Sequence, residues 1–363
     1  MTDVLAPYMY WAKTRPATEF DLAASNMLAC SMDDLPGARE AVELTARNDE
    51  GYAPLTDAIA AHYGVDADRV VHAIGCSGAN FLVVAAHVRP GDAVLMETPG
   101  YDPLAGACRL LGATVHHFQR RAADAFAIDI EAMRRALTPN TRLAIITSPH
   151  NPSGAMLDRA TLRALEAFSV DTGVTVLIDE AYLDISLLLQ ADPTRFARAA
   201  SVSTRLISTS SLTKSYGLNG LRCGWAVVPP GVAERLRRVR DVMDSVGPAP
   251  VDRMSAVAFS HLPKLGERAR KHVTHNLGLV RGFLAIHPQL ETFVPLDATI
   301  LFPRLAGVAD AGPFATRAAE QFGVTVIPGR FFDLPAHIRV SVAGATDNLT
   351  GGLARLAEAL RAT

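Results

Sequence analysis

The sequence predicts an α/β protein in which a mainly parallel seven-stranded sheet forms a large domain and a smaller α+β domain follows it. Three observations lead to this prediction. From about residue 69, short β-branched runs alternate with helix-length segments, which is typical of a parallel sheet covered on both faces. Two of the runs, Leu143–Ile146 and Val174–Ile178, are almost continuously apolar, as strands buried on both sides are. Residues 247–250 (Gly-Pro-Ala-Pro) then break the alternation.

Seven segments are predicted to be strands because each is short, apolar and bounded by turn residues. In chain order they are Val70–Ile74, Ala93–Glu97, Thr114–Phe118, Leu143–Thr147, Val174–Asp179, Leu206–Ser210 and Cys223–Val228. Segments of helical periodicity lie between most of them, at Ala79–Val88, Leu104–Leu111, Ile130–Leu137 and Arg159–Thr172. Turn sequences such as Arg-Pro-Gly-Asp at 89–92 separate these elements.

After residue 250 the pattern changes to long helical segments, roughly over residues 256–286. Short strands are expected around Ile300–Pro303 and His337–Val342, and an amphipathic segment closes the chain at Asn348–Leu360. We therefore expect a large domain over residues 41–246 and a small α+β domain over residues 247–363.

The composition is that of a folded globular protein. The 363 residues include 35 Lys and Arg against 37 Asp and Glu, and 49% are hydrophobic. This balance excludes disorder and gives no electrostatic reason to expect nucleic acid or a membrane as a partner. We see neither a membrane-length apolar stretch nor a secretory signal. The cysteines form no CxxC pair, so we expect reduced thiols, no metal site and a cytoplasmic location.

Polar segments follow several of the predicted strands, where ligands of parallel sheets bind. Residues 75–79 (Gly-Cys-Ser-Gly-Ala) open a helix, so the backbone N–H groups of Cys76 and Ser77 are placed to receive an anion. A plain glycine-rich turn is the alternative. Residues 148–154 place Asn151 between two prolines that fix the backbone and aim one amide side chain. A turn with a helix N-cap is the alternative there.

Asp179 ends a very apolar strand, and a buried carboxylate is costly unless a cation meets it. A ligand with a protonated ring nitrogen would supply that cation, and an N-cap or a metal carboxylate are the alternatives. In the small domain, Arg339 lies inside an apolar strand. An arginine in this position is a salt-bridge partner or a clamp for a carboxylate at the domain cleft.

The segment 208–225 has the densest polar pattern, with Lys214 among hydroxyl residues and glycines. A lysine that forms an imine needs such room, whereas the alternative is a surface lysine in a polar loop. Ser211 and Arg222 offer a hydroxyl and a bidentate guanidinium, which together suit a phosphate.

The segments SPHNPSG (148–154), DEAY (179–182), SLTKSYGLNGLRCGW (211–225) and HIRVS (337–341) resemble, in this order and spacing, those of the class I/II aminotransferases. These are pyridoxal 5′-phosphate (PLP) enzymes of fold type I, the aspartate aminotransferase-like superfamily. The resemblance covers about residues 40–345. It implies a homodimeric transferase of amino acid metabolism that moves an amino group from an L-amino acid to a 2-oxo acid.

The resemblance also implies roles for individual residues. Lys214 matches the lysine that forms the internal aldimine, a Schiff base with PLP, and later shuttles the α-proton. Asp179 matches the aspartate that pairs with the pyridinium nitrogen and keeps the ring able to accept electrons. Tyr101 matches the aromatic residue that stacks on the ring, and Arg339 matches the arginine that binds the α-carboxylate of the substrate.

The other cofactor ligands follow in the same way. Asn151 and Tyr182 match the pair that hydrogen-bonds the phenolic oxygen of PLP, and the phosphate ligands are Ser211, Arg222 and the Cys76–Ser77 backbone. The N-terminal segment, residues 1–40, is expected to pack on the small domain and over the cleft. Its Tyr8–Trp11 and Ser25–Asn26 stretches are where we expect substrate specificity to be set. Asn26 is a substrate-binding candidate, as are Arg339 and Asn151.

Three features depart from the usual pattern of the family. Tyr52 is the candidate for the tyrosine that reaches the phosphate of the neighbouring subunit, but the segment after it is shorter than usual. Cys76 stands where small or polar residues are commoner, and only its backbone N–H is needed. Asp241 and Asp244 occupy the segment that in some members presents an arginine to a dicarboxylic substrate. We therefore expect a substrate other than aspartate or glutamate, unless these two aspartates merely face solvent.

The motifs do not decide which bond at Cα breaks. Other PLP reactions of the same fold therefore remain alternatives: β-elimination, decarboxylation, retro-aldol cleavage or oxidation. An aminotransferase-like effector-sensing module is a more distant alternative, because only about 40 residues precede the core and no basic patch is present. A dinucleotide-binding enzyme is disfavoured, since GxGxxG is absent.

Overall fold

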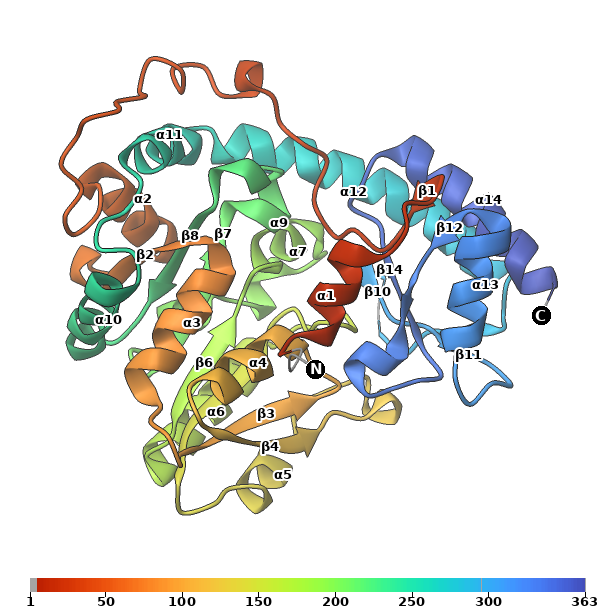
Figure 1. Ribbon diagram of the computed structural model, residues 1–363, viewed down its shortest axis with the longest axis horizontal. Coiled ribbons are helices and arrows are strands. Elements are labelled where there is room, and N and C mark those ends of the chain that lie inside the picture. The colour runs from red at the N-terminus through yellow and green to blue at the C-terminus, as the bar shows by residue number, and fades with distance from the viewer. Residues whose placement is uncertain (1–4, 295, 363) are drawn as a thin grey trace.

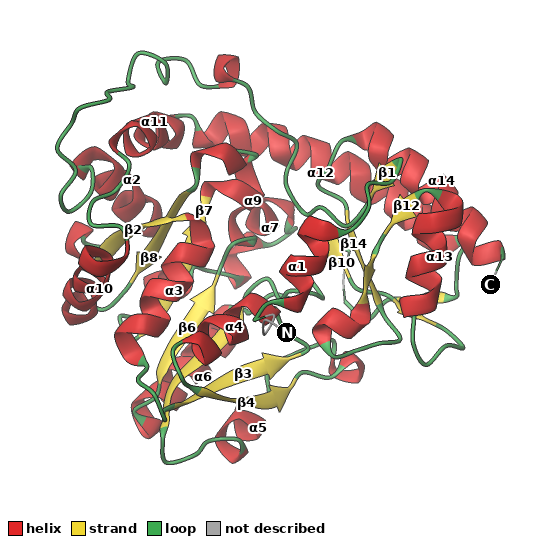
Figure 2. Cartoon of the chain, viewed as in Figure 1, coloured by secondary structure: helices red, strands yellow, loops and turns green. Residues whose placement is uncertain are grey.

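The computed structural model describes residues 5–294 and 296–362. The first four residues of the expected N-terminal segment lie outside the described residues, as do Pro295 and Thr363 of the expected small domain. Figures 1 and 2 show a large sheet covered by helices and, beside it, a second group of short strands and helices from the C-terminal part of the chain. No helix among the described residues is long and apolar enough to cross a membrane.

All seven predicted strands form, and they make one mostly parallel sheet in the order β2-β8-β7-β6-β5-β3-β4. The α/β fold class is thus confirmed. Only β8 runs antiparallel to its neighbours β2 and β7 within this sheet. The strands are β2 (Val70–Ile74), β3 (Ala93–Thr98), β4 (Thr114–Gln119), β5 (Thr141–Thr147), β6 (Thr175–Asp179), β7 (Leu206–Ser211) and β8 (Cys223–Val227).

Helices cover both faces of the sheet because successive strand residues point to opposite sides. Ile145 packs with α3 (Gly75–His87), α4 (Asp102–Leu110) and α10 (Pro230–Met243), whereas Ala144 and Ile146 pack with α5 (Ile130–Arg135), α6 (Arg159–Thr172) and α8 (Ala199–Val202). A third cluster joins β2 and β8 to α2 (Ala53–Tyr63), α9 (Leu212–Tyr216) and α11 (Ala249–Ser260). A further helix, α7 (Leu183–Leu189), follows β6.

Two predicted helices have different limits in the structure. The helix expected at Ala79 begins at Gly75, directly after β2, so the strand-to-helix turn is itself the first turn of α3. The long helical pattern at 256–286 is divided into α11 and α12 (Leu262–Ala285). Pro263 lies in the first turn of α12, where its missing N–H is tolerated, but its ring disfavours a helix through the preceding residues.

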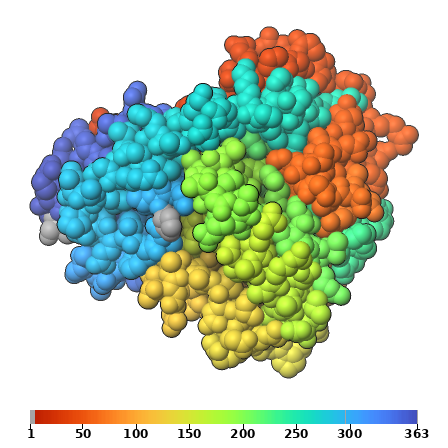
Figure 3. All heavy atoms as spheres, turned by 180° about the vertical axis from the view of Figure 1, so that it is seen from behind, coloured from red at the N-terminus to blue at the C-terminus, as the bar shows by residue number. Residues whose placement is uncertain are grey.

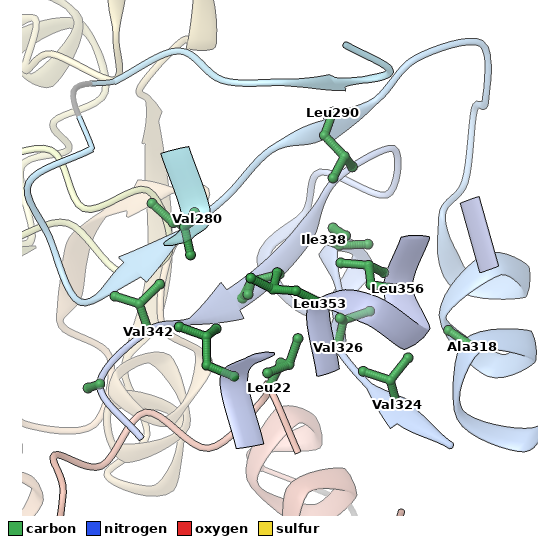
Figure 4. Close-up of a cluster of buried hydrophobic side chains, with 14 of the residues drawn as sticks. Leu22, Val280, Leu290, Ala318, Val324, Val326, Ile338, Val342, Leu353 and Leu356 are labelled. Carbon is green, nitrogen blue, oxygen red and sulfur yellow. The ribbon is translucent and has the colours of Figure 1, made fainter. Parts of the chain in front are cut away.

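A second hydrophobic core lies in the C-terminal part. It joins the three-stranded sheet β10-β14-β13 to α12 and two further helices, with Leu22 of the N-terminal segment inserted among them (Figure 4). Its elements are β9 (Leu290–Glu291), β10 (Ile300–Leu301), β11 (Arg304–Leu305), α13 (Gly312–Phe322), β12 (Val324–Thr325), β13 (Ile327–Pro328), β14 (Ile338–Ser341) and α14 (Thr346–Arg361).

Two segments connect the cores. The first residues of α12 pack in the large core and its later turns in the second, so this helix spans both (Figure 3). The N-terminal segment crosses in the other direction: α1 (Pro7–Thr14) contacts α4, and β1 (Phe20–Asp21) pairs with β12. The cleft between the cores is therefore bordered by the N-terminal segment.

The antiparallel strand β8 packs directly against the start of α3. Adding one methyl group to β8 at this contact is therefore predicted to destabilise the fold. A Cβ at Gly224 would overlap the backbone of Gly75. We expect Gly224→Ala to lower the free energy of unfolding by about 3 kcal/mol, through overpacking. Urea denaturation measures this. Gly231→Ala is the matched control because nothing lies near its Cβ; an equal loss in both variants would contradict the prediction.

Candidate active site

One cavity of about 530 Å³ opens where the carboxyl ends of the large sheet face the second core. Every site residue expected from the sequence lines it except Tyr52. Those residues are Asn26, Cys76, Ser77, Tyr101, Asn151, Asp179, Tyr182, Ser211, Lys214, Arg222 and Arg339. Strands β5, β6 and β7 supply the centre of the wall, β14 supplies Arg339, and the N-terminal segment completes the rim.

Asp179 ends β6 and is buried. Burial raises the pKa of its carboxyl group, and hydrogen bonds from Ala181 N, Asn80 and Cys76 partly offset that rise. The donors are Ala181 N to Oδ1 (2.9 Å), Cys76 Sγ to Oδ1 (3.3 Å) and Asn80 Nδ2 to Oδ2 (2.7 Å). The expectation that only the backbone of Cys76 matters is thus incomplete, because its thiol contacts Asp179.

Lys214 lies in α9, the short helix that follows β7. Its Nζ donates to Asn26 Oδ1 (2.8 Å) and Ser25 Oγ (3.3 Å). Desolvation in the cleft lowers the pKa of the Lys214 amine to about 8. The amine consequently loses its proton at lower pH than an ordinary lysine, so its neutral form can act as a nucleophile or a base.

An anion-binding end forms at the start of α3. Ser77 and Ser211 line the cavity there, and the guanidinium of Arg222 lies so close to Gly75 that a Cβ on the glycine would overlap it. No carboxylate of the described residues is within ion-pair distance of Arg222. A helix N-terminus, two hydroxyl groups and a guanidinium without a carboxylate partner are groups that suit a phosphate.

Arg339 is buried in β14 and likewise has no carboxylate partner among the described residues. Nη1 donates to Asn151 Oδ1 (2.8 Å), Nη2 donates to the Tyr8 hydroxyl (2.8 Å), and Nε is buried without a partner. A buried cation without a counter-charge is costly. The site therefore favours an incoming carboxylate.

Two tyrosines complete the walls. The Tyr182 hydroxyl shares a hydrogen bond with Ser25 Oγ (2.8 Å), so Ser25 connects it to Lys214. Tyr101 is the N-cap residue of α4, which follows β3, and contacts Tyr8 edge-on, with ring centroids 6.0 Å apart. Burial raises the pKa of both Tyr182 and Tyr101, so both hydroxyl groups are protonated at neutral pH.

Three expected residues lie elsewhere. Tyr52 begins α2 outside the cavity, and the Arg253 guanidinium covers its ring at 4.5 Å. Asp241 pairs with Arg238, and Asp244 pairs with Arg240. Neither aspartate lines the cavity, so the sequence argument that they repel a second carboxylate receives no support from this chain.

Three residues at the site are not among those expected to bind ligand from the sequence. Asn80 and Thr209 connect α3 and β7 to Asp179, and Tyr8, expected only to lie over the cleft, contacts Arg339 directly. A polar residue inside the apolar helix Ala79–Val88 was the one available signal for Asn80.

These donors fit PLP group by group. The phosphate suits the Arg222 end, the ring nitrogen suits the Asp179 carboxylate, and the aldehyde suits the Lys214 amine. A Cβ at Gly75 would overlap the Arg222 guanidinium in its present position, and the φ of +69° at this residue also favours glycine. Among the described residues, no group of His, Cys, Asp and Glu could hold a metal ion.

The depressed pKa of Lys214 predicts a pH-dependent stability of the cofactor-free protein. Lys214→Met removes the amine, and we expect it to stabilise the protein at pH 7 by roughly 2 kcal/mol. In the wild type the native state releases this proton near pH 8 and the unfolded state near 10.5. The wild type therefore gains stability relative to the variant as pH rises from about 8 towards 10.5. Unfolding of both proteins between pH 7 and 10 measures the difference, and a constant difference would contradict the prediction.

Comparisons with known proteins identify the family of the chain. The family model described as aminotransferase class I and II matches residues 43–359. Capreomycidine synthase of Streptomyces vinaceus is 33% identical over 90% of this chain and 84% of its own length. A probable N-succinyldiaminopimelate aminotransferase, DapC of Mycobacterium tuberculosis, is 32% identical over 79% of this chain and 74% of its own. The solved structure of the PLP-dependent cyclase OrfR has a TM-score of 0.88 at 26% identity, covering 100% of this chain and 98% of that one. The chain therefore belongs to the class I and II aminotransferase family, whose members are PLP-dependent enzymes.

Proposed function

We propose that this protein is an aminotransferase that moves the amino group of an L-amino acid to a 2-oxo acid. The observation that carries the proposal is the shared cavity of Lys214 and Arg339. An amine with a pKa of about 8 and a buried guanidinium without a counter-charge suit a substrate that has a carboxylate on the carbon to be deprotonated.

The proposed reaction assigns a role to each of these residues. Arg339 binds the α-carboxylate and orients the substrate. Lys214 accepts the Cα proton on Nζ and would deliver it to the former aldehyde carbon of the cofactor, while Ser25 and Asn26 hold the amine in place. PLP, when bound, supplies the carbonyl that condenses with the substrate amine and the ring that accepts the electrons released at Cα. Lys214 can serve as a base because its amine loses its proton at mildly alkaline pH.

The remaining cavity residues would hold the cofactor. Asp179 would pair with the ring nitrogen, Asn151 and Tyr182 would donate to the phenolic oxygen, and Tyr101 would cover the ring face. The phosphate would be bound by Ser211, Arg222 and the Cys76–Ser77 backbone at the start of α3. The match of all these residues to one cavity supports this assignment.

The donor that we propose carries no second carboxylate in its side chain. Four cationic residues in the described part of the chain line the cavity, and Arg15 is the one to which no role has been assigned so far. It lies on the outer wall. Asp21 already neutralises it at 2.6 Å. A second carboxylate would therefore have to compete with Asp21 for this arginine, whereas a neutral or cationic side chain would not.

We also propose that the enzyme is a homodimer in which Tyr52 reaches the phosphate of the partner. Exposed apolar residues lie in the last turn of α10 and directly after it, and include Val242, which is 90% exposed, and Val246. Arg222, Asp244 and Gly247 border one crevice, so this apolar surface adjoins the phosphate end. A second copy bound there would bury the surface next to the cofactor.

A second candidate function is removal of the Cα proton followed by loss of a β-substituent and ring closure. The likeness to the PLP-dependent cyclase OrfR and to capreomycidine synthase favours it over the other PLP reactions. The same Lys214 and Arg339 would serve its first step, so the cavity alone does not separate it from transamination.

A spectroscopic assay with single amino acids separates the two. We expect the visible absorption band of the bound cofactor to disappear on addition of a neutral or basic amino acid, with one equivalent of 2-oxo acid released. A persistent band with water released from a β-hydroxy amino acid would support the second candidate instead. A faster reaction with aspartate or glutamate would contradict the proposed donor class. Lys214→Ala should abolish either change.

The contact between Tyr8 and Arg339 predicts a specific kinetic effect. The Tyr8 hydroxyl accepts from Arg339, so its own hydrogen is free to donate to the α-carboxylate. Tyr8→Phe should raise KM for the amino donor about tenfold, the worth of a hydrogen bond to a charged group, with a smaller change in kcat. Tyr10→Phe is the matched control, since Tyr10 is on the same helix and 60% exposed. An unchanged KM in Tyr8→Phe would show that the hydroxyl does not contact the substrate.

A further inference from the structure

We propose that Asn80, oriented by Thr209, is a positioning residue that keeps Asp179 ionised and aimed at the ring nitrogen of PLP. Asn80 is in the second turn of α3, outside all the motifs that identify the family. The inference depends on the cofactor of the family and not on which reaction the enzyme performs.

The hydrogen bonds to the Asp179 carboxylate are divided between its two oxygens. Oδ1 accepts from the backbone of Ala181 and from the Cys76 thiol, at 2.9 and 3.3 Å. Oδ2 accepts from Asn80 Nδ2 at 2.7 Å, the shortest of the three contacts. Among the described residues, Asn80 is the one hydrogen-bond donor to Oδ2.

A second hydrogen bond fixes which way the Asn80 amide faces. The Thr209 hydroxyl donates to Asn80 Oδ1 at 2.5 Å, and both side chains are buried. With its oxygen turned towards Thr209 on β7, the amide can offer only its NH2 group to Asp179. The hydrogen bonds therefore run in one direction: Thr209 donates to Asn80, and Asn80 donates to the Asp179 carboxylate.

The orientation of the Asn80 amide matters because burial favours the protonated form of Asp179. A protonated carboxyl group would present a proton to a protonated ring nitrogen, and the ion pair would be lost. An amide NH2 group donates to the anion and stabilises it selectively. Packing does not account for Asn80, because its neighbours in α3 include the buried Leu82, Val83 and Val84, among which a buried amide is costly without a partner.

Cofactor binding by the cofactor-free protein tests the inference without an activity assay. We expect Asn80→Leu to weaken PLP binding by about tenfold to a hundredfold, as loss of a hydrogen bond to a charge does. The decisive comparison is the 1-deaza analogue of PLP, in which CH replaces the ring nitrogen. Its affinity should be unchanged or improved in Asn80→Leu, because no ion pair with Asp179 exists to be lost.

Two controls separate this role from a loss of folding. Asn276→Leu removes another buried amide, one that hydrogen-bonds Val342 O in the second core, and it should leave both affinities unchanged. Thr209→Val removes the donor that orients Asn80 with less disturbance of α3. It should weaken PLP binding selectively, and Thr209→Ser should restore it.

Equal losses for PLP and the deaza analogue in Asn80→Leu and in Thr209→Val would overturn the inference, because they would indicate a general disturbance of the cavity. Unchanged PLP affinity in Asn80→Leu would overturn it as well. A failure of the amino acid assay described above would leave this result standing, since binding is measured without a substrate.

Discussion

A buried carboxylate at the carboxyl end of β6 is the constraint on which the rest of the site depends. Asp179 is buried at the end of β6, so its charge is stable only with oriented donors and a cation nearby. Asn80, Cys76 and Ala181 supply the donors. The cation must come from a ligand or from Lys214, whose own charge the same desolvation disfavours. The same buried cavity thus contains the Asp179 carboxylate, which suits a ring nitrogen, and the Lys214 amine, which suits proton transfer.

The antiparallel strand β8 brings Arg222 to the other end of the cavity, at the start of α3. Because β8 returns beside β2, the residue that precedes it, Arg222, meets the first turn of α3. Gly75 and Gly224 permit this approach, since a Cβ on either would overlap its neighbour. A helix N-terminus and a guanidinium consequently face the same cavity that Asp179 lines.

Substrate recognition depends on contacts between the two cores. Arg339 comes from the second core, Asn151 from the large sheet, and Tyr8 from the N-terminal helix α1, yet the three side chains form one hydrogen-bonded group. Movement of either core or of α1 would change the carboxylate site. On the outer wall, Arg15 is paired with Asp21. The residues that orient the α-carboxylate are therefore different from those that face the substrate side chain.

The sequence by itself determined the strands of the large sheet and placed Asp179, Lys214 and Arg222 at their ends, because apolar runs and turn residues are local signals. It could not give the break before α12, the direction of β8, or the contacts of Asn80 and Tyr8. Thr209 and Asn80 are on different elements, and Arg339 and Tyr8 are at opposite ends of the chain. Only tertiary packing brings such residues together. A hydrogen bond between distant segments leaves no periodic pattern in the sequence of either segment. The tertiary structure therefore decided which donors surround the groups that the sequence had already located.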